Sequence, residues 1–93
     1  MPAVRKYQVI LEPQAISDLQ SWQQNKPELV KRISRLLDSV KADPFSGIGK
    51  PKALRYDFEG LWSRRIDKDH RIVYEVIGST VYVLSLKGHY GDK

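Results

Sequence analysis

A chain of 93 residues with a hydrophobic fraction of 41% can fold as one domain around a single core. It has no cysteine, which excludes disulfides and thiolate metal sites. Its longest apolar run, Val81 to Leu84, is too short for a membrane-spanning helix. Sixteen Lys and Arg against eleven Asp and Glu give a net charge of +5, which favours an acidic partner only modestly. We therefore expect a cytoplasmic protein without a signal peptide and with one domain over residues 1–93, of which 91–93 could be a tail.

The chain passes through patterns typical of strands and of helices. Apolar residues alternate from Arg5 to Leu11, which predicts a strand, and Pro13 suits the first turn of a helix that ends near Gln24. Pro27 starts a second helix with an apolar stripe. A loop over 43–49 precedes short strands near 51–56, 61–66, 71–77 and 81–87. This order predicts an α+β fold: an N-terminal strand and a two-helix hairpin packed on a small, mainly antiparallel sheet.

The register of the last three strands decides which side chains meet. Three-residue turns at Asp67–Asp69 and Gly78–Thr80 gather most of the apolar residues on one face. We expect the core face to carry Trp62, Arg64, Ile66, His70, Ile72, Tyr74, Val76, Tyr82, Leu84 and Leu86. The other face then carries Ser63, Arg65, Arg71, Val73, Ser85, Lys87 and His89, with Arg65 opposite Arg71 and Arg71 opposite Lys87.

A row of cations on one sheet face is a local conflict, because like charges directly opposite each other are destabilising. Such conflicts tend to mark functional sites, and guanidinium groups beside an imidazole suit a phosphate whose charge rises during cleavage. An exposed basic face without any function is the alternative interpretation.

The C-terminal half carries specific motifs. It contains Gly60-x-Trp62-Ser-Arg-Arg-Ile66 and His70-Arg-x-Val-Tyr74, followed by His89-Tyr90. Together with Gly49-Lys-Pro51 and Leu54, these motifs resemble the YoeB/Txe toxins of the RelE/ParE toxin–antitoxin superfamily, over about Trp22 to Tyr90. The resemblance implies a RelE-like fold and an mRNA endoribonuclease that needs no metal or cofactor and acts in the ribosomal A site. It also implies an acidic YefM-like antitoxin, the 70S ribosome and mRNA as partners. The chain could further form a homodimer, and we expect no membrane partner.

The chemistry of the family explains the residue types. The neighbouring ribose 2′-OH attacks the phosphate, so the enzyme moves two protons and stabilises a dianionic transition state. In the family the position of Arg65 provides that stabilisation, with Arg71 beside it. His89 matches the proposed general acid, and Tyr90 matches a tyrosine that stacks on the substrate or donates its hydroxyl. We expect further RNA contacts from Lys50, Arg55 and Lys87.

One position departs from the family pattern. YoeB-type toxins have a general-base glutamate in Lys-Pro-Glu-x-Leu, where this chain has Lys50-Pro-Lys52-Ala-Leu54. Lys52 could act as base or electrostatic aid, or Glu75 could substitute, although it lies about 13 Å from Arg71 along the strand. Alternatively, the protein is weak or silent in catalysis and binds only RNA or antitoxin. A ParE-like inhibitor of DNA gyrase is a further alternative, against which the His89-Tyr90 end argues.

Several other side chains have structural interpretations. We expect His70 to stabilise its turn, and Arg64 to extend past Trp62 to solvent or to pair with an acid such as Asp67. Two histidines without cysteine or paired carboxylates predict no metal site. The basic residues of the second helix are expected to face solvent, with contact to ribosomal RNA as the alternative; they are Lys31, Arg32 and Arg35.

Overall fold

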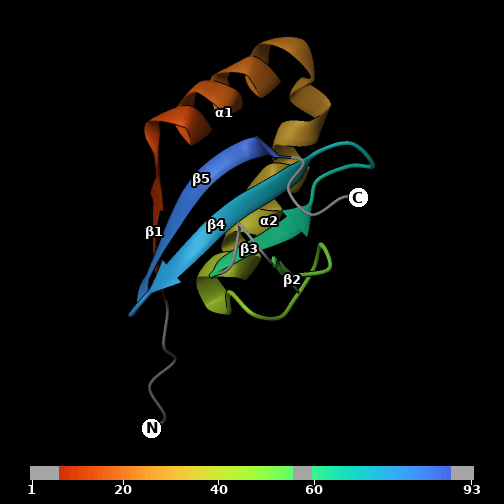
Figure 1. Ribbon diagram of the computed structural model, residues 1–93. Helices are drawn as coiled ribbons and strands as arrows, with labels where there is room; N and C mark the ends of the chain where they lie inside the picture. Colours follow the sequence, from red (N-terminus) through yellow and green to blue (C-terminus); the bar gives the residue numbers. More distant parts are fainter. Residues whose placement is uncertain (1–6, 56–59, 89–93) are drawn as a thin grey trace, which may run out of the picture.

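A five-stranded sheet and two helices make up the part of the chain that the structure describes (Figure 1). The computed structural model describes residues 7–55 and 60–88. The elements are β1 (Gln8–Leu11), α1 (Pro13–Asn25), the 3-10 turn η1 (Pro27–Leu29), α2 (Val30–Ala42), β2 (Lys52–Ala53), β3 (Leu61–Arg65), β4 (Arg71–Ile77) and β5 (Thr80–Gly88). The strand order is β1-β5-β4-β3-β2, with β1 parallel to β5 and the other pairs antiparallel. The predicted α+β fold with a mainly antiparallel sheet is therefore confirmed.

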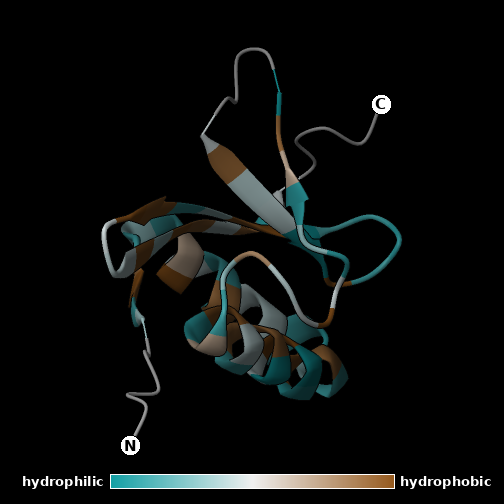
Figure 2. Cartoon of the chain, turned by 90° about the horizontal axis from the view of Figure 1, so that it is seen from below, coloured by the Kyte–Doolittle hydropathy of each residue, from teal (hydrophilic) through white to brown (hydrophobic). Residues whose placement is uncertain are grey.

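Both helices pack on the same face of the sheet. Pro13 opens α1, where its missing N–H leaves no bond unmade. Helix α1 ends at Asn25 because Pro27 disfavours helical geometry at Lys26, which has φ −145° and ψ 67°. The helical ribbons gather on one side of the strands (Figure 2). The core between them contains Ala15, Trp22, Ile33, Leu36 and Val40 from the helices, with Ile66, Ile72, Tyr74, Val81, Val83 and Leu86 from the sheet side.

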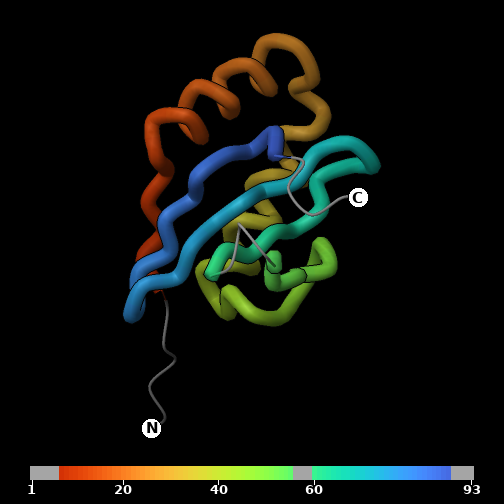
Figure 3. Tube along the Cα trace, in the orientation of Figure 1, coloured from red at the N-terminus to blue at the C-terminus, as the bar shows by residue number. Residues whose placement is uncertain are grey.

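Helix α1 takes the place of a strand beside the second half of β5, as the trace shows (Figure 3). Strand β1 pairs with β5 only as far as Val83, because the chain turns into α1 after Leu11. Beyond that point Asp18 Oδ2 accepts the Leu86 N–H at 2.9 Å, and Trp22 Nε1 donates to the Leu86 carbonyl oxygen at 2.9 Å. Asp18 and Trp22 are four residues apart and so share one side of the helix. Their side chains satisfy the backbone of β5 that a neighbouring strand would otherwise satisfy.

A buried arginine fastens the loop after α2 to the sheet. The Arg64 side chain on β3 is 0% exposed. Its Nε donates to the Tyr74 hydroxyl at 3.1 Å. Its Nη1 donates to Ser39 Oγ at 2.7 Å and to the Ile48 carbonyl oxygen at 3.1 Å. Its Nη2 donates to the carbonyl oxygens of Asp43 at 2.6 Å and Ser46 at 2.8 Å. These bonds match the five N–H donors of a guanidinium, which is what the burial of this charge requires.

The expectation for Arg64 was therefore wrong on both counts: the side chain neither reaches solvent nor pairs with Asp67. The loop offers it inward-pointing carbonyl groups instead. Asp43 shapes this loop, since its carboxylate accepts the Phe45 N–H at 2.9 Å and the Ser46 hydroxyl at 2.8 Å. These hydrogen bonds, helped by the nearby Arg64 charge, hold the pKa of Asp43 below its usual value.

The predicted register of β3 and β4 is confirmed. Arg65 pairs with Arg71, and Ser63 pairs with Val73. The turn between these strands closes with the Ile66 N–H donating to the His70 carbonyl oxygen at 2.9 Å, so it contains the expected three residues. Arg64 and Arg65 consequently point to opposite faces of the sheet.

The predicted register of β4 and β5 is wrong at both ends. Ile77 pairs with Thr80, so the turn holds two residues, and Gly78 at its first position has φ 60°, as a type II′ turn requires. Two irregularities in the pairing, one on each side of Val73, change the register. Val73 itself still pairs with Ser85, as expected. As a result Val81 and Val83 take the core positions that were expected for Tyr82 and Leu84, and Arg71 pairs with Gly88 instead of Lys87.

Replacing Arg64 with Met should destabilise the fold by roughly 2–4 kcal/mol, because several buried oxygen atoms would lose their donor. Urea unfolding followed by tryptophan fluorescence measures this change. Arg35→Met, at an exposed position of α2, is the matched control and should leave the unfolding midpoint nearly unchanged. Equal midpoints for the two variants would contradict the importance of this network.

Candidate active site

Three cations from three neighbouring strands lie on the sheet face opposite the helices. Lys52 on β2 pairs with Ser63 on β3, and Arg65 on β3 pairs with Arg71 on β4. Paired residues share a face, as do residues two apart on one strand. Lys52, Arg65 and Arg71 therefore project from the same face. This part of the predicted site is brought together by the fold.

The two paired arginines differ in their surroundings. Arg71 is 8% exposed, and its Nη1 donates to Ser63 Oγ at 3.2 Å, whereas Arg65 is exposed to solvent. Ser63 and Val73, on the same face, are both 0% exposed, so this face is not uniformly solvated. The face thus combines one enclosed, hydrogen-bonded guanidinium with one that solvent reaches freely.

Strand β5 ends opposite Arg71. Gly88, the last described residue of β5, pairs with Arg71. The candidate residues His89 and Tyr90 follow directly in the sequence and lie outside the described residues.

Two of the predicted RNA contacts flank β2, Lys50 before the strand and Arg55 after it. Lys50 and Arg55 are exposed, as is Lys52. Lys50 has φ 53°, a left-handed conformation that costs a non-glycine residue roughly 1–2 kcal/mol. The preceding Gly49 also has a positive φ, 84°, and a Cβ there would lie 2.5 Å from Leu36 Cδ2. The Gly49 carbonyl oxygen accepts the Arg65 N–H at 2.7 Å, which holds this strained turn against β3.

Lys87 does not join the cation row, which corrects its predicted place on this face. Its ammonium donates to Ser21 Oγ and lies 5.4 Å from the centroid of the Trp22 ring, so it faces α1. The physical reason is the register shift in β5, which puts Gly88 rather than Lys87 opposite Arg71.

Glu75 is on the same face as the cations but at the far end of β4. It pairs with Leu61 on one side and Tyr82 on the other. Four residues separate it from Arg71, or about 13 Å along a strand. This separation disfavours Glu75 as the base.

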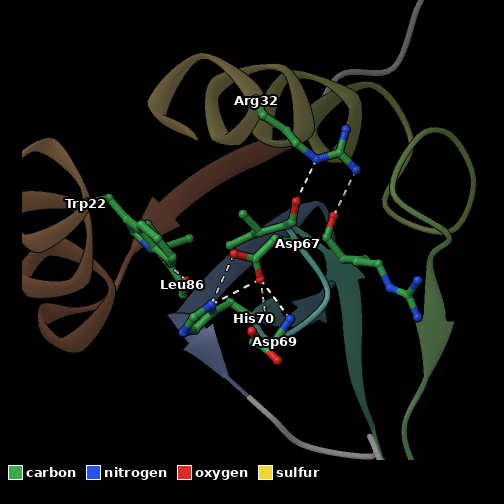
Figure 4. Close-up of polar contacts among 8 residues, drawn as sticks. Trp22, Arg32, Asp67, Asp69, His70 and Leu86 are labelled. Atoms are coloured by element: carbon green, nitrogen blue, oxygen red, sulfur yellow. Dashed lines mark hydrogen bonds and ion pairs between the residues drawn. The ribbon is translucent and has the colours of Figure 1, made fainter. Parts of the chain in front are cut away.

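The turn between β3 and β4 is built around Asp67 (Figure 4). Asp67 Oδ1 accepts the backbone N–H of Asp69 at 2.8 Å and of His70 at 2.7 Å, and it lies 3.0 Å from His70 Nδ1. The His70 ring also meets Trp22 edge-on, with centroids 4.9 Å apart. Partial burial alone would raise the pKa of Asp67, but the hydrogen bonds outweigh it and the pKa is lowered. The predicted structural role of His70 is confirmed.

Arg32 on α2 is exposed to solvent, as expected, but its guanidinium also contacts the end of β3 beside this turn. Its Nε donates to the Ile66 carbonyl oxygen at 2.7 Å and its Nη2 to the Arg65 carbonyl oxygen at 3.3 Å (Figure 4). Helical periodicity identified Arg32 as outside the apolar stripe but gave no signal for these carbonyl groups. The backbone around Arg65 is thus held from two sides, by Arg32 and by Gly49.

Metal and membrane features are not found in the part of the chain that the structure describes. Within residues 7–55 and 60–88, no three His, Cys, Asp or Glu side chains come together in a way that could hold a metal ion. No helix in the same ranges is both long and apolar enough to cross a membrane.

Residues 11–90 match a family model described as the YoeB-like toxin of bacterial type II toxin–antitoxin systems. The chain belongs to this family. The predicted resemblance is therefore confirmed, and the match runs from the last residue of β1 through β5 to residue 90.

Individual relatives agree with this assignment. A curated Toxin YoeB from Synechocystis is 44% identical over 69 residues, which is 74% of this chain and 80% of the relative. A YoeB/ParE toxin structure from Agrobacterium tumefaciens has a TM-score of 0.83 at 36% identity and covers 89% of this chain and 99% of its own. The Staphylococcus aureus YoeB dimer has a TM-score of 0.81 at 38% identity and covers 91% and 99%. The YoeB–YefM complex from the same organism gives 0.79.

The pKa of Asp67 predicts an acid-dependent loss of stability in this toxin. Because the folded-state pKa is lowered, the carboxylate stabilises the fold above its unfolded-state pKa, and this contribution disappears as the pH falls through the folded-state pKa. Asp67→Asn should therefore lose less stability than the wild type between about pH 5 and about pH 2. Urea midpoints across that range test this, with Asp38→Asn on exposed α2 surface as control. Parallel pH profiles of wild type and Asp67→Asn would contradict it.

Proposed function

We propose that this toxin is a ribosome-dependent, metal-independent endoribonuclease that cuts mRNA in the ribosomal A site through attack by the ribose 2′-OH. One observation carries the proposal: in a chain of the YoeB family, Lys52, Arg65 and Arg71 project from one sheet face, at the end where β5 leads into His89. The proposed domain is the whole chain, residues 1–93, acting in the cytoplasm.

The two arginines suit the stabilisation of the transition state. Attack by the 2′-oxygen produces a pentavalent phosphorus with two negative charges, so fixed donors are more useful there than solvated ones. Arg71 is enclosed and already hydrogen-bonded, which reduces the reorganisation needed when charge develops. Arg65 is exposed and can bind a phosphate oxygen as the mRNA arrives.

The proton transfers are assigned to Lys52 and to the end of the chain. His89 protonates the departing 5′-oxygen as general acid, and Tyr90 stacks on the substrate or donates its hydroxyl. Lys52 accepts the 2′-OH proton or supports the negative charge. It lies two strands across and two residues along from Arg71, about 12 Å in all, a span that two long side chains can close around one phosphodiester. Lys50 and Arg55 then contact flanking RNA, whereas Lys87 is left out because it bonds to Ser21.

The proposed partners follow from the relatives and from charge. The S. aureus relative is solved as a YoeB–YefM complex and as a dimer. We infer an acidic YefM-like antitoxin for this chain, whose net charge of +5 suits such a partner, and a homodimer as a second assembly. The 70S ribosome and mRNA are the remaining partners.

A catalytically weak or silent protein that binds RNA or antitoxin is the second candidate. The observation that favours it is Lys52 itself, an exposed lysine at the position where the resemblance implies a carboxylate base. Glu75 does not replace that base, since it lies at the other end of β4.

Primer extension on ribosome-bound mRNA tests the proposed activity. Purified wild-type toxin should produce new A-site cuts, and His89→Gln should lower the cleavage rate by about 100- to 10,000-fold, as expected for loss of a general acid. An uncut mRNA at toxin concentrations equal to those of the ribosomes would favour the silent alternative. A gyrase supercoiling assay would then be the next measurement.

Substitutions of Lys52 separate its two roles. If Lys52 is the base, Lys52→Ala should lower the cleavage rate by about 100-fold or more, and Lys52→Glu should recover most of the rate. If it is only an electrostatic aid, Lys52→Arg should keep the activity while Lys52→Glu loses it. Single-turnover rates on programmed ribosomes distinguish these outcomes. Equal rates for all four proteins would exclude Lys52 from the reaction.

A further inference from the structure

Ser63 lies at the centre of the cation face and is completely enclosed. Its side chain is 0% exposed, between Lys52 on β2 and Val73 on β4. Its hydroxyl oxygen accepts a hydrogen bond from Arg71 Nη1 at 3.2 Å, and Arg71 itself is only 8% exposed. A buried hydroxyl is therefore in contact with the guanidinium that the proposed reaction uses.

A hydrogen bond at one Nη atom has a geometric consequence for the whole guanidinium. The group is planar, and its five N–H donors keep fixed directions relative to one another. A hydrogen bond from Arg71 Nη1 to the Ser63 hydroxyl on β3 therefore restricts rotation of the whole Arg71 guanidinium. Misplacement of a catalytic group by about 1 Å can cost as much as about 100-fold in rate, so such a restriction matters for a group that stabilises a transition state.

We propose that Ser63 is a positioning residue for Arg71: its hydroxyl sets the direction in which the guanidinium meets the scissile phosphate. The inference rests on the proposed nuclease function and deepens it. Ser63 is fully buried and does not touch the substrate; it acts through Arg71. Its place in the Trp-Ser-Arg-Arg motif is then explained by orientation of an arginine on the next strand as well as by packing.

Ser85 provides a matched comparison within the same sheet. It pairs with Val73 from the other side, so Ser63 and Ser85 flank the same residue on the same face. The Ser85 hydroxyl is buried as well, but it has no hydrogen-bond partner in the part of the chain that the structure describes. Ser→Ala at either position removes one buried hydroxyl from this face, yet only Ser63→Ala removes a bond to Arg71.

Single-turnover cleavage on programmed ribosomes tests the proposal. Ser63→Ala should slow the rate at saturating ribosomes by roughly 10- to 100-fold, while the half-saturating ribosome concentration stays within about twofold of the wild type. Ser85→Ala should keep the wild-type rate, and Ser63→Thr, which retains the hydroxyl, should recover most of the activity. Wild-type cleavage by Ser63→Ala, or equal losses in the two alanine variants, would overturn the proposal. If urea unfolding shows that Ser63→Ala does not fold, Ser63→Cys, with a weaker acceptor of similar size, takes its place with the same expected loss.

A second measurement does not depend on cleavage, and so separates this inference from the proposed function. Nitrogen-15 relaxation of the Arg71 side chain should give a high order parameter in the wild type and in Ser85→Ala, and a clearly lower one in Ser63→Ala. An unchanged order parameter in Ser63→Ala would overturn the positioning role. Absence of cleavage by the wild type, with the order parameter behaving as expected, would count against the nuclease function alone.

Discussion

The burial of the Arg64 guanidinium is the constraint on which the arrangement of this toxin depends. A charge that is 0% exposed is tolerated only if its donors meet acceptors, and the acceptors here come from Ser39, Tyr74 and the loop after α2. One side chain thereby joins α2, the central strands and the loop after α2. The loop has to adopt one shape because three of its carbonyl groups must point at Arg64.

The buried Arg64 also helps to position the candidate site. The same loop continues through Gly49 and the strained Lys50 into β2, so its attachment fixes where the chain enters the sheet at Lys52. Arg64 and Arg65 are neighbours on β3, and strand alternation sends one into the structural network and the other to the opposite face. The backbone of β3 at Arg65 is fixed by two sets of hydrogen bonds. The Arg65 N–H donates to the Gly49 carbonyl oxygen, and the Arg32 guanidinium donates to the carbonyl oxygens of Arg65 and Ile66. Of these two adjacent arginines, the buried Arg64 stabilises the fold, and the exposed Arg65 is available for the proposed catalysis.

Sequence patterns predicted the fold and the β3–β4 part of the site correctly. They failed for the β4–β5 register, and the reasons are local. The β3–β4 register followed from alternation because the turn holds three residues, which correctly placed Arg65 opposite Arg71. Alternation fails at β5, where register shifts around Val73 move Lys87 to the helix side. Periodicity reports only which residues are apolar, so the carbonyl partners of Arg64 and Arg32 gave no signal. Ser63 was expected on the correct face, but its bond to Arg71 depends on a side-chain geometry that a sequence does not encode directly.

The chemical nature of the cut ends distinguishes attack by the ribose 2′-OH from attack by water, because the proposed site has groups for in-line attack by the 2′-OH and none is assigned to activating water. Mass spectrometry of mRNA fragments released from toxin-treated ribosomes would identify both ends. Attack by the 2′-OH predicts a 2′,3′-cyclic phosphate, or the 3′-phosphate formed from it, on the upstream fragment, and a 5′-hydroxyl on the downstream fragment. A 5′-phosphate on the downstream fragment, with a free 3′-hydroxyl upstream, would contradict it.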